Sequence, residues 1–118
     1  MSLMPGDIVL IPYAPYTNRL AVKARPCLVI SGLQFNKSGP DVILAPISSN
    51  IRIGDPKQIV IESSDISFVD TGLKQTSAVK CGAIFAYSKV QVRRKLGFVQ
   101  QQILKQVRDK VIEILTGD

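Results

Sequence analysis

The sequence predicts a small, mainly β protein that ends in one α-helix. Short apolar runs recur between turn residues over most of the chain, which is typical of several short strands. Near the C-terminus, apolar residues instead recur at helical spacing. The length of 118 residues suits one domain with one core, so we expect a single domain over residues 1–118. Several short strands and one helix together favour a strongly bent antiparallel sheet or an open barrel.

Four predicted strands lie in the first half of the chain. The first two are "GDIVLIP" (residues 6–12) and "RPCLVIS" (25–31), each an apolar run beside a turn residue or proline. "VILAPIS" (42–48) and the alternating "QIVIE" (58–62) follow. Intervening segments that are polar or rich in Gly, Pro and Asn are predicted to be exposed loops, residues 13–23 and 32–41.

The second half is less regular until the C-terminal helix. Residues 63–72 are expected to be irregular or a single helical turn, and 73–87 to form one or two strands with a possible bulge at Gly82. A short turn and a strand near 95–99 follow. The helix is expected over 100–115. Its apolar stripe consists of Ile103, Leu104, Val107, Val111, Ile112 and Leu115.

Composition limits the chemistry that the chain can perform. The net charge of +6 favours a polyanionic partner such as nucleic acid or an acidic protein, although many basic domains bind neither. The chain has no histidine, and its two cysteines match no zinc spacing, so we expect inert thiols and no metal or cofactor. No apolar run could span a bilayer and no signal peptide is visible, so we expect a soluble, cytoplasmic protein.

Two residues at strand ends are candidates for chemistry. Arg25 opens the second predicted strand and Ser48 closes the third. If these strands pair, a guanidinium and a hydroxyl could converge on a phosphate and stabilise the phosphorane formed when a ribose 2′-OH attacks its own 3′-phosphate. The alternatives remain open: Arg25 could be a strand-end cation paired with Asp7 or Glu62, and Ser48 a turn hydroxyl that caps backbone.

The order and spacing of these motifs resemble a known family. "GDIVLIP", "RPCLVIS" and "VILAPIS" are similar to the opening strands of the MazF/PemK-like toxin endoribonucleases of toxin–antitoxin systems. The later "LKQTSAVKCGAIFAYSK" and "RRKLGFV" occupy the places of the family's later strands, so the likeness covers most of the chain. The family's catalytic arginine falls on Arg25 and its catalytic hydroxyl, usually threonine, on Ser48. The missing β-methyl leaves Ser48 less restricted in χ1.

The resemblance implies a fold, an activity and partners. The fold is an SH3-like barrel of the CcdB/MazF type. The activity is metal-independent, sequence-specific cleavage of single-stranded RNA, which leaves a 2′,3′-cyclic phosphate and a 5′-OH. The implied partners are a second copy of the chain, as a homodimer, and an acidic antitoxin protein, with DNA binding by the toxin–antitoxin complex and no membrane association. Asp7 falls on the family's Gly-Asp position and is expected to be structural.

The predicted loops carry candidate RNA contacts. Arg19 and Lys23 in the first loop could bind the RNA backbone. In the second loop, Phe35 could stack on a base, and Gln34 and Asn36 could bind base edges. Each of these side chains could equally serve only to keep a loop in solvent.

Two other classes of protein remain as alternatives. A CcdB-like topoisomerase poison would share the fold, but that group depends on a tryptophan near its C-terminus and this chain has none. A non-catalytic SH3-like binding module would need a groove dense in aromatic residues, and the chain has only four Phe and three Tyr.

Overall fold

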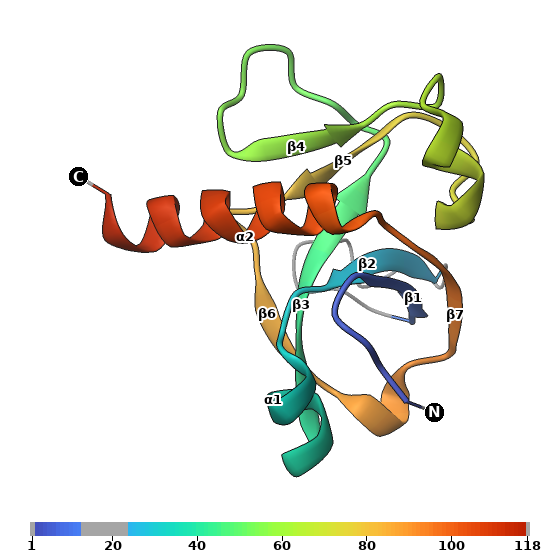
Figure 1. Ribbon diagram of the computed structural model, residues 1–118, viewed down its shortest axis with the longest axis vertical. Helices are drawn as coiled ribbons and strands as arrows, with labels where there is room; N and C mark the ends of the chain where they lie inside the picture. The colour runs from blue at the N-terminus through green and yellow to red at the C-terminus, as the bar shows by residue number, and fades with distance from the viewer. Residues whose placement is uncertain (1, 13–23, 118) are drawn as a thin grey trace.

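The computed structural model describes residues 2–12 and 24–117. Within them, seven strands form one antiparallel sheet in the order β4-β5-β3-β2-β1-β7, and β6 also pairs with β3 (Figure 1). The strands are β1 (Asp7–Ile11), β2 (Arg25–Val29), β3 (Asp41–Ser48), β4 (Gln58–Ile61), β5 (Ser77–Lys80), β6 (Phe85–Ser88) and β7 (Arg94–Phe98). The helices are α1 (Leu33–Ser38), α2 (Gln101–Thr116) and the short 3-10 helices η1 (Ile66–Thr71) and η2 (Lys89–Gln91). The predicted class, a mainly β fold of short antiparallel strands with a C-terminal helix, is confirmed.

Strand β3 organises the sheet because it is long enough to pair with three others. Its first half pairs with β6, its middle with β2, and its last two residues with β5. The sheet therefore bends where β3 passes from β6 to β5, and β4 and β5 lie apart from β1 and β7 in Figure 1. The edge strands β4 and β7 do not pair with one another, so the sheet is bent and open rather than a closed barrel.

Both faces of the central strands are buried, which explains their continuous apolar sequences. Ile8 and Leu28 belong to one core cluster, and their neighbours Val9 and Cys27 to a second, because successive side chains of a strand point to opposite faces. Helix α2 covers the first cluster with the buried residues of its apolar stripe, Leu104, Val107 and Val111. The second cluster is covered in part by Leu3, from the segment before β1.

The structure corrects two details of the predicted elements. Residues 32–41 are not wholly a loop, because they contain the short helix α1. Gly82 is not in a bulge: it lies in a turn between β5 and β6, so residues 73–87 form two strands. The irregularity lies instead between β1 and β7, where Ile8 pairs with Gly97 and Val9 with Lys95. Residues 63–72, expected to be irregular or a single helical turn, contain the six-residue 3-10 helix η1.

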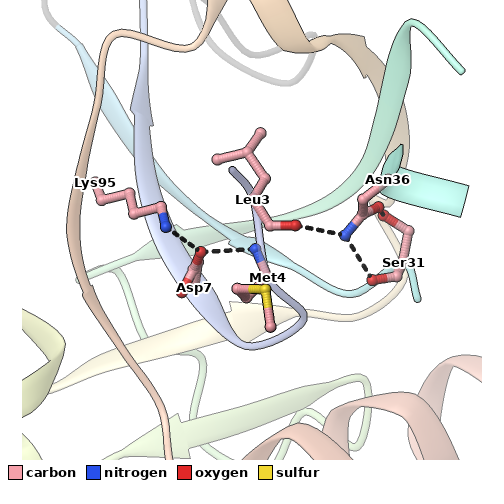
Figure 2. A network of polar contacts seen from close by, with 6 residues as sticks. All are labelled: Leu3, Met4, Asp7, Ser31, Asn36 and Lys95. Carbon is pink, nitrogen blue, oxygen red and sulfur yellow. Dashed lines mark hydrogen bonds and ion pairs between the residues drawn. The ribbon is translucent and has the colours of Figure 1, made fainter. Parts of the chain in front are cut away.

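Asp7 has the structural role that was expected of it. Its Oδ2 accepts a hydrogen bond from the Met4 backbone N–H at 2.8 Å and forms an ion pair with Lys95 Nζ at 3.1 Å (Figure 2). One carboxylate thus joins the start of β1 to β7 and to the segment that carries Leu3. None of the helices in residues 2–12 and 24–117 is long and apolar enough to cross a membrane.

Candidate functional site

Arg25 and Ser48 line the same cavity. Strands β2 and β3 pair in a register that joins Cys27 to Pro46, and continuing it by two residues brings Arg25 opposite Ser48. The cavity has a volume of about 550 Å³ and is walled by the ends of these strands, by β7 and by the segment between η1 and β5. The two strand-end candidates are therefore brought together, as the strand pairing predicted.

Arg25 has a guanidinium that the surrounding structure leaves incompletely bonded. Its Nε is buried and donates to no acceptor within the described part of the chain. Asp7 is bonded to Lys95 and Met4, and neither Asp7 nor Glu62 forms an ion pair with Arg25. An unsatisfied buried donor costs about 1–3 kcal/mol, so its retention favours a ligand-binding role over strand capping.

Ser48 has a hydroxyl that is held in place and can still donate. The Asn50 backbone N–H donates to Ser48 Oγ at 3.0 Å, as in the turn-capping alternative. This bond uses an acceptor lone pair of Oγ and leaves the hydroxyl hydrogen free for a ligand. The bond also restrains the side chain, which in part replaces the restriction that the β-methyl of a threonine would give.

The rest of the cavity wall is basic and polar. Lys74 and Arg94 add two cations to Arg25, and Gln75, Ser49 and Ser77 add polar side chains. The described residues that line the cavity include no Asp or Glu. Three cations without a carboxylate favour an anion with several oxygens, such as a phosphate.

Lys74 and Gln75 are among the cavity residues that were not predicted from the sequence. Lys74 and Gln75 lie in a segment that was expected to be strand, and no local pattern marks them as a site. They reach the cavity because η1 and β7 pack with their backbones in contact. A Cβ on Gly72 would collide with the carbonyl oxygen of Leu96, and a Cβ on Gly97 with that of Asp70.

The predicted RNA-contact residues are dispersed. Arg19 and Lys23 lie outside the described residues. Gln34 and Phe35 are exposed on α1, with Phe35 at 46% exposure, but neither lines the cavity with Arg25. Their role as contacts for the more distant parts of a substrate remains a prediction.

Asn36 is a structural residue, in place of the base contact that was predicted. It is 4% exposed. Its Nδ2 donates to the backbone oxygens of Leu3 at 3.0 Å and Ser31 at 3.1 Å (Figure 2). Its Oδ1 accepts a hydrogen bond from Ser31 Oγ. With both ends of the amide occupied inside the protein, Asn36 fastens α1 to the segment before β1.

The cysteines are buried thiols, as expected. Burial raises the pKa of Cys27 to about 12. Burial also raises the pKa of Cys81 to about 11, against a smaller opposing effect of Lys110. Among the described residues, no group of three His, Cys, Asp or Glu side chains is placed to hold a metal ion.

Comparison with known proteins identifies the family. Residues 4–115 match the family model described as "PemK-like, MazF-like toxin of type II toxin-antitoxin system". The chain belongs to this family. The resemblance seen in the strand motifs is confirmed, and the match favours a PemK/MazF-like toxin over a topoisomerase poison or a passive SH3-like module. A search of curated proteins found no match.

Solved structures share the fold of this PemK/MazF-like chain at low sequence identity. The Mycobacterium tuberculosis toxin MazF-mt6 is 19% identical with a TM-score of 0.72, over 95% of this chain and 98% of that one. A mycobacterial endoribonuclease in complex with its cognate antitoxin is 19% identical with a TM-score of 0.76, over 98% of this chain and 97% of that one. MazE-MazF (Form-II) from Deinococcus radiodurans is 18% identical with a TM-score of 0.76, over 100% of this chain and 99% of that one.

Proposed function

We propose that this toxin is an endoribonuclease that cleaves single-stranded RNA at short sequences without a metal ion. The observation that carries the proposal is the meeting of Arg25, with its unbonded buried Nε, and Ser48, with its free hydroxyl hydrogen, in one cavity that also receives Lys74 and Arg94. Family membership and the similarity to structures named as endoribonucleases support it.

The reaction that suits these groups uses a nucleophile from the RNA itself. The ribose 2′-oxygen attacks the adjacent 3′-phosphorus, a new P–O2′ bond forms, and the bond from phosphorus to the 5′-oxygen breaks. The proton that the 2′-oxygen loses is balanced by the proton that the departing 5′-oxygen gains. The products are a 2′,3′-cyclic phosphate and a 5′-OH, and the protein supplies positioning and charge.

Four side chains of the cavity have a defined task in this proposal. The planar guanidinium of Arg25 donates to two non-bridging oxygens of the phosphorane, whose charge exceeds that of the starting phosphodiester. Ser48 donates one further hydrogen bond. Arginine is a poor base near neutral pH because its guanidinium keeps its proton there, so we assign Arg25 an electrostatic role. Lys74 and Arg94 hold the flanking backbone.

The same basic surface suits the proposed partners. We infer a homodimer in the cytoplasm and an acidic antitoxin segment that binds across the RNA site, since a polyanion and an acidic chain are attracted by the same cations. Similar structures contain a cognate antitoxin or MazE. RNA and antitoxin should therefore compete, and RNA affinity that is unchanged at saturating antitoxin would disprove the shared site.

The activity is tested with purified protein and a short single-stranded RNA. Cleavage should persist in EDTA, yield a 2′,3′-cyclic phosphate and a 5′-OH, and fail on an RNA with one 2′-deoxy residue at the mapped scissile position. An RNA with 2′-deoxy one nucleotide away is the matched control and should be cut. Loss of all cleavage in EDTA, or cutting of the deoxy substrate, would contradict the mechanism.

A further inference from the structure

A second set of hydrogen bonds connects Ser48 to a lysine outside the Arg25 cavity. Strand β5 pairs with the end of β3, with Ala78 opposite Ser48, and on its other side with β4, where Lys80 lies opposite Gln58. The chain between β3 and β4, residues 49–57, must therefore cross from one neighbour of β5 to the other. Lys80 lies close enough to this segment to bind its backbone.

Lys80 Nζ makes two hydrogen bonds, one to the 49–57 segment and one to β4. It donates to the Asn50 backbone oxygen at 3.0 Å and to Gln58 Oε1 at 2.8 Å. Gln58 Nε2 in turn donates to the Arg52 backbone oxygen at 2.7 Å. One lysine and one glutamine thus bind the loop at Asn50 and Arg52 and tie it to the sheet.

Asn50, which Lys80 binds, is also the residue that orients Ser48. Asn50 is fixed through its carbonyl oxygen by Lys80, and its own N–H donates to Ser48 Oγ at 3.0 Å. A displacement of Asn50 would release the hydroxyl, because the Asn50 N–H is the only donor to Ser48 Oγ within the described residues. Since serine lacks a β-methyl to restrict χ1, this support matters more here than it would for a threonine.

We propose that Lys80, with Gln58, is a positioning residue for Ser48: it holds the Asn50 backbone so that the Ser48 hydroxyl faces the scissile phosphate. The inference rests on the proposed function, because it takes Ser48 to act in RNA cleavage. Lys80 itself does not line the Arg25 cavity and need not touch the reacting atoms. It acts through geometry, and small misplacements of a catalytic group can cost large factors in rate.

A simpler role for Lys80 would be attraction of RNA by its charge. Lys57 provides the matched comparison, because it lines the same neighbouring cavity as Lys80 and Asn50 but its side chain makes no hydrogen bond with the described residues. Lys57→Met removes the same charge from the same surface. General electrostatic attraction would make the two lysines equivalent and would act mainly on RNA affinity.

The experiment measures the single-turnover cleavage rate at saturating protein, and RNA affinity separately. Lys80→Met should lower the rate on the order of tenfold with little change in affinity, whereas Lys57→Met should stay within about twofold. Lys80→Arg, which restores donors of similar reach, should recover part of the rate. In a Ser48→Ala background, Lys80→Met should have almost no further effect, because no hydroxyl remains to be positioned.

The outcomes separate this inference from the proposed function. Equal losses for Lys80→Met and Lys57→Met, or a full tenfold loss in the Ser48→Ala background, would overturn the positioning role while leaving RNA cleavage intact. A wild-type protein that cuts no RNA, or a Ser48→Ala variant as fast as wild type, would overturn the proposed role of Ser48 and the inference with it. If Lys80→Met is unfolded at the assay temperature, Gln58→Met carries the same expectation.

Discussion

Arg25 lies opposite Ser48 when the antiparallel register of β2 and β3 is continued from the Cys27–Pro46 pair toward the strand ends. Positions that face one another on neighbouring antiparallel strands place their side chains close together, and Arg25 and Ser48 line one cavity. The two groups therefore belong to the sheet's own geometry and need no separate loop to meet.

Arg25→Lys should abolish most cleavage while leaving RNA binding largely intact. Lysine keeps the charge but loses the planar fork of donors, so the loss should be on the order of 10² in rate if Arg25 stabilises the phosphorane. Single-turnover cleavage and RNA affinity are measured side by side, with a thermal melt to check folding. Arg93→Lys, outside the cavity, is the control. Cleavage by Arg25→Lys at near wild-type rate would return Arg25 to a capping or steering role.

Ser48→Ala should lower the cleavage rate on the order of 10², because the alanine cannot donate to the phosphorane. Ser48→Thr should retain wild-type activity, since threonine keeps the donor and restricts χ1. The Asn50 N–H already restrains Oγ, so the methyl should add little rate. The same single-turnover assay decides this, and an inactive Ser48→Thr variant would show that the added methyl does not fit the site.

Asp7→Asn should lower the free energy of unfolding by about 1–2 kcal/mol, because Asp7 binds both Lys95 and the Met4 N–H at a mostly buried position. Asp109→Asn is the matched control, since Asp109 pairs with Lys105 at 2.7 Å on the exposed surface of α2. Its loss should cost at most about 0.5 kcal/mol. Chemical denaturation of both variants measures the difference, and equal costs would contradict the structural role of Asp7.

Asn36→Ala should cost about 2 kcal/mol of stability, because it leaves the backbone oxygens of Leu3 and Ser31 without their amide donor. Gln34→Ala, two residues away on the exposed side of α1, should leave the melting temperature unchanged. RNA affinity is measured on both folded variants. Weaker RNA binding for Gln34→Ala alone would support its predicted base contact, and the same effect for Asn36→Ala would contradict its structural role.

The cysteines predict how stability changes at alkaline pH. Burial raises the pKa of Cys27 to about 12 and that of Cys81 to about 11, above the ordinary 9.0. The unfolded chain therefore loses these protons first, and stability that is complete below pH 9.0 should fall as pH rises toward 12. Burial both shields the Cys27 thiol and disfavours its thiolate, so near pH 8 a thiol reagent should label it only after unfolding.

A Cys27→Ala, Cys81→Ala variant should lose stability less steeply above pH 9.0 than wild type. Melting temperatures across this range test the slope. Rapid labelling of both thiols in the folded protein near pH 8 would contradict their burial.

The sequence predicts the central strands β1, β2 and β3 well because their continuous apolar runs reflect burial on both faces of the sheet. Helix α1 was missed since its six residues, LQFNKS, lie among Gly, Ser and Pro, and its N-cap Gly32 offers no side-chain cap. One of its anchors is the hydrogen bond from Asn36 to the Leu3 backbone oxygen, 33 positions away. A contact of that range leaves no local pattern.

The residues of the site likewise divide into those that a local sequence pattern indicates and those that only long-range packing brings together. Arg25 and Ser48 could be found because each marks a strand end and the two strands are neighbours. Lys74 and Gln75 could not, because they reach the cavity only through the packing of η1 on β7. The support of Ser48 by Asn50 and Lys80 likewise depends on where the 49–57 segment crosses the sheet.

Gly72, which follows η1, and Gly97, which lies in β7, are needed for the fold and not for the proposed chemistry. Mutations that abolish toxicity should therefore fall into two classes. Gly72 has a positive φ of 72°, and any side chain there or at Gly97 would strike the backbone of the facing segment. Under the proposed function, survivors selected with changes at either glycine should carry misfolded, degraded protein. Survivors with changes at Arg25 or Ser48 should instead accumulate intact, folded protein. The intracellular abundance of the variant protein, rather than cell growth, therefore distinguishes a misfolded variant from a folded variant with an inactive site.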